Sequence, residues 1–60
     1  MSTIIVNYEI LIEQDPTVLA RKVRSSIEKG WEPFQGMIYG KYGNGVEFWA
    51  QPIVMRRDVK

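Results

Sequence analysis

A ten-residue stretch near the N-terminus, residues 4–13, alternates with a period of two. Ile4, Val6, Tyr8, Ile10 and Ile12 share one side of this stretch, and Ile5, Asn7, Glu9, Leu11 and Glu13 share the other. This period is that of a β-strand, whose successive side chains point to opposite faces. We therefore predict a strand over residues 4–12, with one fully apolar face and one mixed face.

The segment after this strand carries the start and stop signals of a helix. Asp15 can cap the free amides of a first turn, and Pro16 fits the first helical position because its missing amide hydrogen is not needed there. Apolar residues then recur at helical spacing, four residues apart: Leu19, Val23 and Ile27. Gly30 can adopt the left-handed conformation that often follows a helix. We predict a helix over residues 16–29.

Two more strands are predicted on either side of a glycine-rich turn. They cover residues 34–42 and 46–56, and Gly43-Asn44-Gly45 between them is a strong hairpin signal. If Asn44 and Gly45 are the two central turn residues, the register follows: Gly36 lies opposite Ile53, Tyr39 opposite Ala50 and Gly40 opposite Trp49. Small residues then face large ones in each of these pairs, which favours this register.

The element order β-α-β-β predicts an α+β fold over residues 1–60, with a single helix packed on a three-stranded, mainly antiparallel sheet. The helical crossover makes the first two strands run in the same direction. Placing the last strand in the middle makes every neighbouring pair antiparallel, and we favour this order. Pro52 counts against it, because proline requires an edge position, an outward-facing amide or a bulge.

Both faces of the predicted hairpin are apolar. One face carries Met37, Tyr39, Phe48, Ala50 and Val54, and the other carries Ile38, Tyr42, Trp49, Ile53 and Met55. A single helix covers only one face, so on the second face Trp49 and Tyr42 are scattered surface residues, or Trp31 and Phe34 fold over them, or the face is used for self-association. We favour a homo-oligomer, because a small chain without disulfides often stabilises itself in this way. The predicted interface residues are Ile38, Trp49, Ile53 and Met55.

The composition argues against catalysis. The chain has no Cys and no His, which removes the commonest general base and the commonest metal ligands. Its carboxylates show no metal-ligand spacing, and Ser25 and Ser26 lie in the predicted helix without a histidine partner. Residues 36–45 contain four glycines but lack the Lys-Ser/Thr ending of a phosphate-binding loop. We expect no enzyme activity, no metal and no cofactor.

Arginine and aromatic side chains form a candidate site for a small anionic ligand. Arginines can bind phosphate groups, and aromatic rings can stack on a base. Gln51, a polar residue among apolar ones, either satisfies a buried partner or points at a ligand. The candidate ligand-binding residues are Arg21, Arg24, Tyr39, Tyr42, Trp49, Gln51, Arg56 and Arg57. The net charge of +1 argues against nucleic acid as a partner.

No unbroken apolar run, Ile4-Ile5-Val6 included, is longer than three residues, which is far too short to span a membrane. The N-terminal residues also lack the apolar stretch of a secretory signal. We therefore expect no membrane partner and a cytoplasmic location, which is the host cytoplasm if the protein is encoded by a phage.

Three stretches resemble a known family. They are “YEILIEQD”, “KGWEPFQG” after the predicted helix and “FWAQPIVMRR” in the last strand, and together they cover roughly residues 7–57. This pattern resembles the small bacterial and phage proteins grouped as domain of unknown function number 1737. The matching positions are Gly30, Trp31, Pro33, Gly36, Trp49, Gln51, Ile53 and Val54. The resemblance implies a β-α-β-β fold and no catalytic residues. Pro52 departs from it, because a small residue is more usual there.

These observations favour a non-enzymatic, oligomeric binding module of phage or bacterial origin. Its expected ligand is a small anion such as a signalling nucleotide, held between subunits, by analogy with phage proteins that sequester such signals to counter host defence. Two alternatives stay open. One is an inhibitor or adaptor that binds a host protein through its exposed sheet face. The other is a weak nucleic-acid accessory protein that uses the helix arginines.

Overall fold

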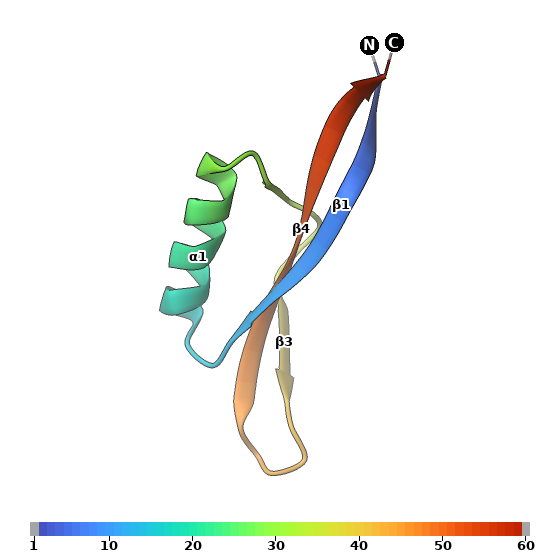
Figure 1. Cartoon of the computed structure of the whole chain (residues 1–60). Helices are drawn as coiled ribbons and strands as arrows, with labels where there is room; N and C mark the ends of the chain where they lie inside the picture. Colours follow the sequence, from blue (N-terminus) through green and yellow to red (C-terminus); the bar gives the residue numbers. More distant parts are fainter. Residues whose placement is uncertain (1, 60) are drawn as a thin grey trace.

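One helix lies beside a long, twisted antiparallel sheet in the computed structural model, which describes residues 2–59 (Figure 1). The elements are β1 (Ser2–Glu13), α1 (Pro16–Glu28), β2 (Glu32–Pro33), β3 (Ile38–Lys41) and β4 (Glu47–Val59). The predicted α+β class, with its single helix on an antiparallel sheet, is confirmed. The sheet has four strands rather than three, because residues 32–33 form a short strand of their own ahead of the strand predicted over residues 34–42, of which only residues 38–41 form β3.

β4 is the centre of the sheet. β1 pairs with one edge of β4, and β2 and β3 pair with the other edge, all of them antiparallel. The central position predicted for the last strand is therefore correct. Both long strands extend beyond their predicted limits of 4–12 and 46–56, because β1 and β4 pair from Ser2 and Val59 onward.

Pro52 explains why the pairing along the β2–β3 edge of β4 is interrupted. Its carbonyl accepts a hydrogen bond from the Phe34 amide at 2.9 Å. In an extended strand the nitrogen and carbonyl of one residue point to the same edge, so the missing amide hydrogen of Pro52 also faces away from β1. The Pro52 nitrogen faces the point where residues 34–37 leave the sheet between β2 and β3. The ladder between β1 and β4 thus loses no donor, and a proline is tolerated in a central strand.

The helix has the predicted caps. The Thr17 amide donates to the Asp15 carboxylate at 2.8 Å, and Pro16 occupies the first turn. α1 ends at Glu28, one residue before the predicted end, and Lys29 is its C-cap. Gly30 follows with a φ of 100°, a left-handed conformation that favours glycine.

The hairpin register differs from the prediction by one residue. The Gly45 amide donates to the Tyr42 carbonyl, and the Tyr42 amide donates to the Val46 carbonyl, both at 2.9 Å. The loop therefore has three residues, Gly43 to Gly45, and Gly45 has a φ of 86°. Tyr39 consequently lies opposite Trp49 rather than Ala50, and Gly40 opposite Phe48 rather than Trp49. Side chains alternate along a strand, so a shift of one residue changes the face on which each β3 side chain lies. Tyr39 therefore shares a face with Trp49, and Ile38 shares a face with Ala50.

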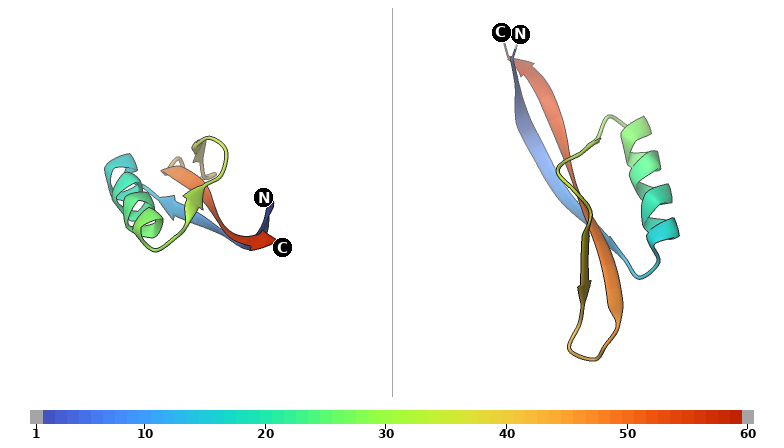
Figure 2. Two further views of the ribbon diagram at one scale, coloured as in Figure 1. Left: turned by 90° about the horizontal axis from the view of Figure 1, so that it is seen from above. Right: turned by 180° about the vertical axis from the view of Figure 1, so that it is seen from behind.

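The molecule is long and thin. Its radius of gyration is 13.5 Å and its longest dimension is 48 Å, whereas a compact 60-residue domain has a radius of about 10 Å. The reason is visible in Figure 2: β1 and β4 continue past α1 as a two-stranded ribbon. We call residues 2–6 and 55–59 the ribbon end. It begins at an irregularity in the β1–β4 register at Val6, between Ile5 and Asn7.

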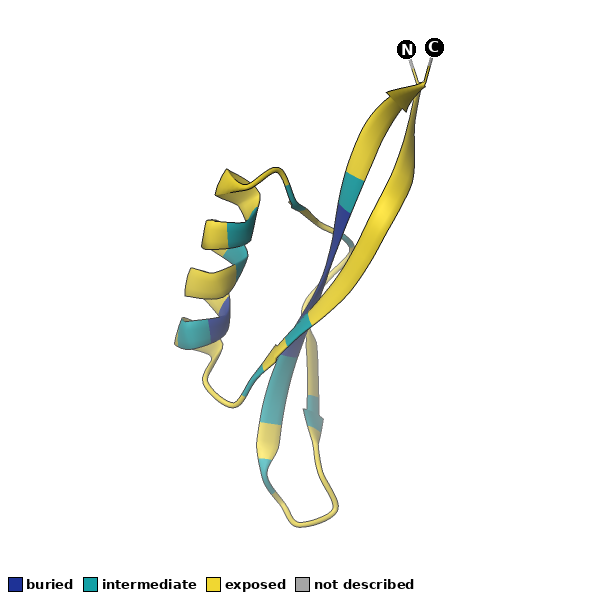
Figure 3. Cartoon of the chain, viewed as in Figure 1, coloured by how far each residue is buried: buried dark blue, intermediate teal, exposed yellow. Residues whose placement is uncertain are grey.

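Buried residues are few and centre on the middle of β4 (Figure 3). The fully buried apolar side chains are Leu19, Ala50, Ile53 and Val54. Pro52 and Gln51, which lie between them in sequence, are also buried. So small a core leaves many large apolar side chains in contact with solvent.

Candidate functional site

The two faces of the sheet are distinguished by their position relative to α1. Lys22 on the helix forms an ion pair with Glu13, and Glu13 lies opposite Trp49 on β4. The next pairs on this face are Leu11 with Gln51 and Glu9 with Ile53. Because cross-strand partners share a face, these pairs lie on the side that the helix covers.

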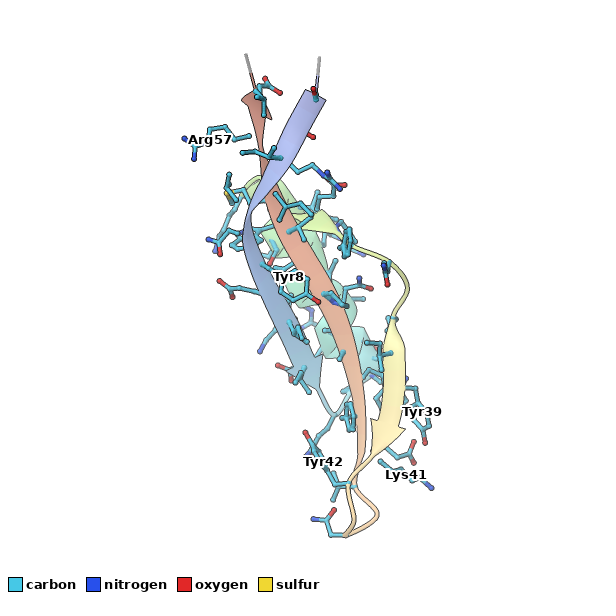
Figure 4. All side chains as sticks on the ribbon, turned by 90° about the vertical axis from the view of Figure 1, so that its right-hand side faces the viewer. Tyr8, Tyr39, Lys41, Tyr42 and Arg57 are labelled. Atoms are coloured by element: carbon cyan, nitrogen blue, oxygen red, sulfur yellow. The ribbon has the colours of Figure 1, made fainter. Side chains whose placement is uncertain are left out.

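The opposite face has no helix over it. Tyr8, Ile10 and Ile12 of β1 lie on this side, opposite Val54, Pro52 and Ala50 of β4. Ile38 of β3 joins them from the other edge of β4. Figure 4 shows the Tyr8 ring on the side of the sheet that faces away from α1.

Large apolar side chains on this face are about half exposed. The exposed fractions are 52% for Tyr8, 51% for Ile10, 51% for Ile12, 50% for Ile38 and 49% for Tyr42. We call these five residues the uncovered face. The register places no carboxylate, ammonium or guanidinium among them. The ion pair between Arg56 Nε and Glu32 Oε1 at 3.1 Å borders them on the same face, because Glu32 lies opposite Val54, the β4 partner of Tyr8.

Phe34 covers one part of the face but not the rest. Its ring meets the Tyr8 ring edge-on, with 6.4 Å between the ring centroids, and Val54 nearby is fully buried. Trp31 stays at the end of α1, where its amide donates to the Ser26 carbonyl. The alternative in which Trp31 and Phe34 fold over the whole second face is therefore not what this single chain adopts, because Ile10, Ile12 and Ile38 remain half exposed.

The four residues predicted to form an interface are divided between the two faces. Ile38 lies on the uncovered face, whereas Trp49, Ile53 and Met55 lie on the helix side, and Ile53 is only 2% exposed. Ile53 therefore has no surface to offer a partner while α1 stays in place. The cause is the one-residue difference in hairpin register. Tyr8, Ile10 and Ile12 were missed as interface candidates, although their alternation in β1 was a visible signal.

The residues predicted to bind a ligand do not converge in one chain. Tyr39, Tyr42 and Trp49 lie near the hairpin, whereas Arg57 lies on the ribbon end (Figure 4). Trp49 and Arg56 are seven positions apart in β4, which is about 23 Å of extended strand. Gln51 donates from Nε2 to the carbonyls of Gln35 at 3.1 Å and Pro52 at 2.9 Å, so its amide nitrogen has backbone partners.

The helix arginines point away from the sheet. Arg21 and Arg24 are exposed and lie about 200° and 140° around the helix from the buried Leu19. Within residues 2–59 the two ion pairs use Lys22 and Arg56. Arg21, Arg24 and Arg57 form none with the described residues, so their guanidinium groups are available to an anion.

Tyr39 has a perturbed ionisation. Its hydroxyl donates to Glu47 Oε2 at 2.9 Å, and its ring lies 5.2 Å from the Trp49 ring. The hydrogen bond to Glu47 raises the pKa of Tyr39 above its ordinary range, and desolvation and the negative charge of Glu47 act in the same direction.

We expect Glu47→Gln to bring the pKa of Tyr39 down toward its usual range. The raised pKa means that the folded state holds the phenol proton more tightly than the unfolded state does. Its contribution to stability is present below the unfolded pKa and is lost as the pH rises through the folded value. An absorbance titration of tyrosinate measures the change. Glu9→Gln is the matched control and should leave the curve unaltered, and identical curves for E47Q and wild type would contradict the assignment.

Other kinds of site find little support in the described residues. In the range 2–59 no three acidic side chains gather as a metal site, and these residues enclose no pocket in a single copy. None of the described helical residues belongs to a helix that is long and apolar enough to cross a membrane. The uncovered face is thus the most distinctive surface that this part of the chain presents.

No family model, curated protein or solved structure matches the chain. The resemblance to domain of unknown function number 1737 therefore gains no support from these comparisons. It stays a hypothesis based on the short motifs around Gly30 and Gln51.

Proposed function

We propose that this protein is a non-enzymatic binding module that works as a homo-oligomer, with the uncovered face as its contact between copies. The observation that supports the proposal is the set of five half-exposed apolar side chains with no charged group among them. Monomers seldom expose a contiguous apolar patch of more than a few hundred Å². Burying such a patch stabilises an assembly by about 25 cal/mol for each Å².

The exposed area is close to what a dimer requires. Half of a large apolar side chain is about 100 Å², so the uncovered face offers about 500 Å². Ile5 on the ribbon end, which is 44% exposed, lies opposite Arg56 on the same side as Val54 and adds to this area. The sum of about 600 Å² compares with about 800 Å² that each partner buries in a typical specific interface. The chain also exposes 4537 Å² in total, whereas a compact monomer of its mass exposes about 4,000 Å².

A charge on the uncovered face should prevent self-association. We expect wild type to elute as a multiple of 7.0 kDa in size-exclusion chromatography coupled to light scattering, and Ile10→Lys to elute as a monomer. The reason is that assembly would bury an unpaired ammonium group, which is strongly unfavourable. Ile27→Lys is the matched control, because Ile27 is 49% exposed on α1 and lies off this face.

Two loading concentrations make this measurement decisive. A wild-type mass of one chain at both concentrations would contradict homo-oligomerisation. It would favour the alternative in which the same face binds a different protein as an inhibitor or adaptor.

A second candidate function is binding of a small anion, such as a signalling nucleotide, by arginines from more than one copy. It is supported by the outward position of Arg21 and Arg24, which have no ion-pair partner among residues 2–59. A role in countering host defence belongs to this candidate and rests on an analogy of size and assembly with phage proteins that sequester such signals.

This candidate predicts a rise in melting temperature with one or more members of a nucleotide panel. Ligand at one hundred times its Kd stabilises the folded state by about 2.7 kcal/mol. The double variant Arg21→Gln/Arg24→Gln should abolish the shift, whereas Lys29→Gln should keep it. A panel that leaves the melting temperature unchanged would exclude nucleotides as the ligand. A binding signal that falls steeply with salt and requires long polynucleotides would point to nucleic acid instead.

A further inference from the structure

We infer that two copies stack their sheets face to face, with both α1 helices on the outside. This inference rests on the proposed homo-oligomer and specifies its geometry and its occupant, a second copy of this chain. The uncovered face reaches across the whole sheet, from Ile10 and Ile12 on one edge to Ile38 on the other. Packed sheets lie about 10 Å apart and interdigitate their inward side chains, which is the arrangement that buries both edges of such a face at once.

The outer edge of β1 is poorly suited to the competing arrangement, in which two edges pair into one wide sheet. The backbone amide and carbonyl of Tyr8 point to this edge. Ile10 and its partner Pro52 direct their backbone groups away from each other, so those of Ile10 face the outer edge. Tyr8 lies two residues before Ile10 and therefore has the same orientation. Its amide already donates to the Asn7 Oδ1 atom at 3.0 Å. The register irregularity at Val6 interrupts the same edge. Irregularities and occupied edge groups are the means by which proteins prevent edge-to-edge pairing.

The other edge of the sheet is short and discontinuous. β2 has two residues and β3 has four, and residues 34–37 leave the sheet between them. Edge pairing would also leave the uncovered face in solvent, so it would not remove the apolar surface that requires a partner. Stacking does remove it.

The chemistry of the face favours a second copy over a charged macromolecule. An apolar surface whose bordering charges, Arg56 and Glu32, are paired with each other is complementary to itself, and its apolar part offers nothing to the phosphates of nucleic acid or to a charged groove. The net charge of +1 also opposes self-association only weakly. The charged residues Arg21, Lys22 and Arg24 belong to α1, which the stack places outside.

Ile38→Lys separates the two geometries. Ile38 lies on the β3 side of β4, away from the β1 edge, so a charge there disrupts stacking but not pairing through β1. We expect the dimer Kd of Ile38→Lys to rise at least tenfold over wild type in sedimentation equilibrium. The neighbouring Tyr39→Lys is the control, because Tyr39 is equally exposed, at 53%, but lies on the helix side. Its dimer Kd should change less than threefold.

Cross-linking provides a readout that does not depend on weakened assembly. The chain has no Cys, so Ile10→Cys, Ile38→Cys and Ser25→Cys each place one thiol at a known position. A bismaleimide that spans about 10 Å, the distance between packed sheets, is added to each variant and to an equimolar mixture of Ile10→Cys and Ile38→Cys. We expect covalent dimers that contain Ile38→Cys, and none for Ser25→Cys on α1.

The outcomes distinguish this inference from the function on which it rests. A wild-type dimer that is insensitive to Ile38→Lys, and that cross-links only through Ile10→Cys, overturns face-to-face stacking and leaves the homo-oligomer intact. Cross-linking through Ser25→Cys alone overturns stacking as well, because it places the helices inside. A wild-type monomer overturns both proposals.

Discussion

Replacing Leu19 with alanine is expected to lower the free energy of unfolding by about 2–5 kcal/mol, the range for large-to-small changes in a core. Leu19 is the one helix residue that is fully buried, so α1 is held to the sheet largely through this side chain. A domain of this size has a single core that rarely supplies more than about 3–5 kcal/mol of stability. The predicted loss is therefore comparable to the whole stability of one chain.

Urea denaturation followed by circular dichroism measures this loss. Ile27→Ala removes a large apolar side chain from the same helix, but Ile27 is 49% exposed and should lose less than about 1 kcal/mol, because most of its area is already in water. Equal unfolding midpoints for L19A and I27A would show that α1 does not pack on the sheet as described.

Replacing Gln51 with leucine should have the second-largest effect. Gln51 is 7% exposed, and its side chain joins β4 to the segment between β2 and β3 by donating to the Gln35 carbonyl. Leucine has a similar volume but no donor, so this carbonyl loses its partner. Gln35 is exposed, so water can replace part of this bond, and the net loss of one hydrogen bond is about 0.5–1.5 kcal/mol. We expect a loss of this size in urea denaturation.

Hydrogen exchange can also show which part of the sheet Q51L destabilises. Hydrogen exchange at the Phe34 amide, which donates to the Pro52 carbonyl, should become faster in Q51L than elsewhere in the sheet. Gln35→Asn is the matched control. It keeps the backbone carbonyl that Gln51 uses, and asparagine tolerates the φ of 64° at this position. If Q35N were as unstable as Q51L, the stability would depend on the Gln35 side chain instead.

Local signals in the sequence were sufficient to place α1 and the central strand. Asp15, Pro16 and Gly30 each act within one turn of the helix, so their effect does not depend on distant contacts. The period of β1 was equally local. The central position of β4 followed from the crossover rule, which applies to any strand-helix-strand unit.

The hairpin register and the broken strand could not be read from the sequence. Gly43-Asn44-Gly45 is compatible with a two-residue loop or a three-residue loop, and the two differ by one residue in register. Residues 34–42 are rich in residues that favour strands, interrupted by Gly36 and Gly40, and the break between β2 and β3 lies beside Pro52, far along the chain. Non-local pairings of this kind override propensity.

The uncovered face was predicted to exist, but most of its residues were not identified. Tyr8, Ile10 and Ile12 were grouped correctly on one side of β1 by their alternation. Whether α1 covers that side or the other depends on packing, since Leu11 and Ile53 offer the helix an apolar surface on the opposite face. The one-residue error in the predicted register also placed Ile38 on the face of Trp49 and Tyr39 on the face of Ala50, whereas the structure has the reverse.

The pairing of Ser2 with Val59 brings both ends of the described chain to a single tip of the molecule (Figure 1). A fluorescent dye attached near either end therefore reports the location of the same point. In a two-fold stack with parallel sheets, the two tips lie together and energy transfer between their dyes is efficient. In an antiparallel stack, the tips lie at opposite ends of an object at least as long as the 48 Å of one chain. One label thus gives the polarity of the assembly.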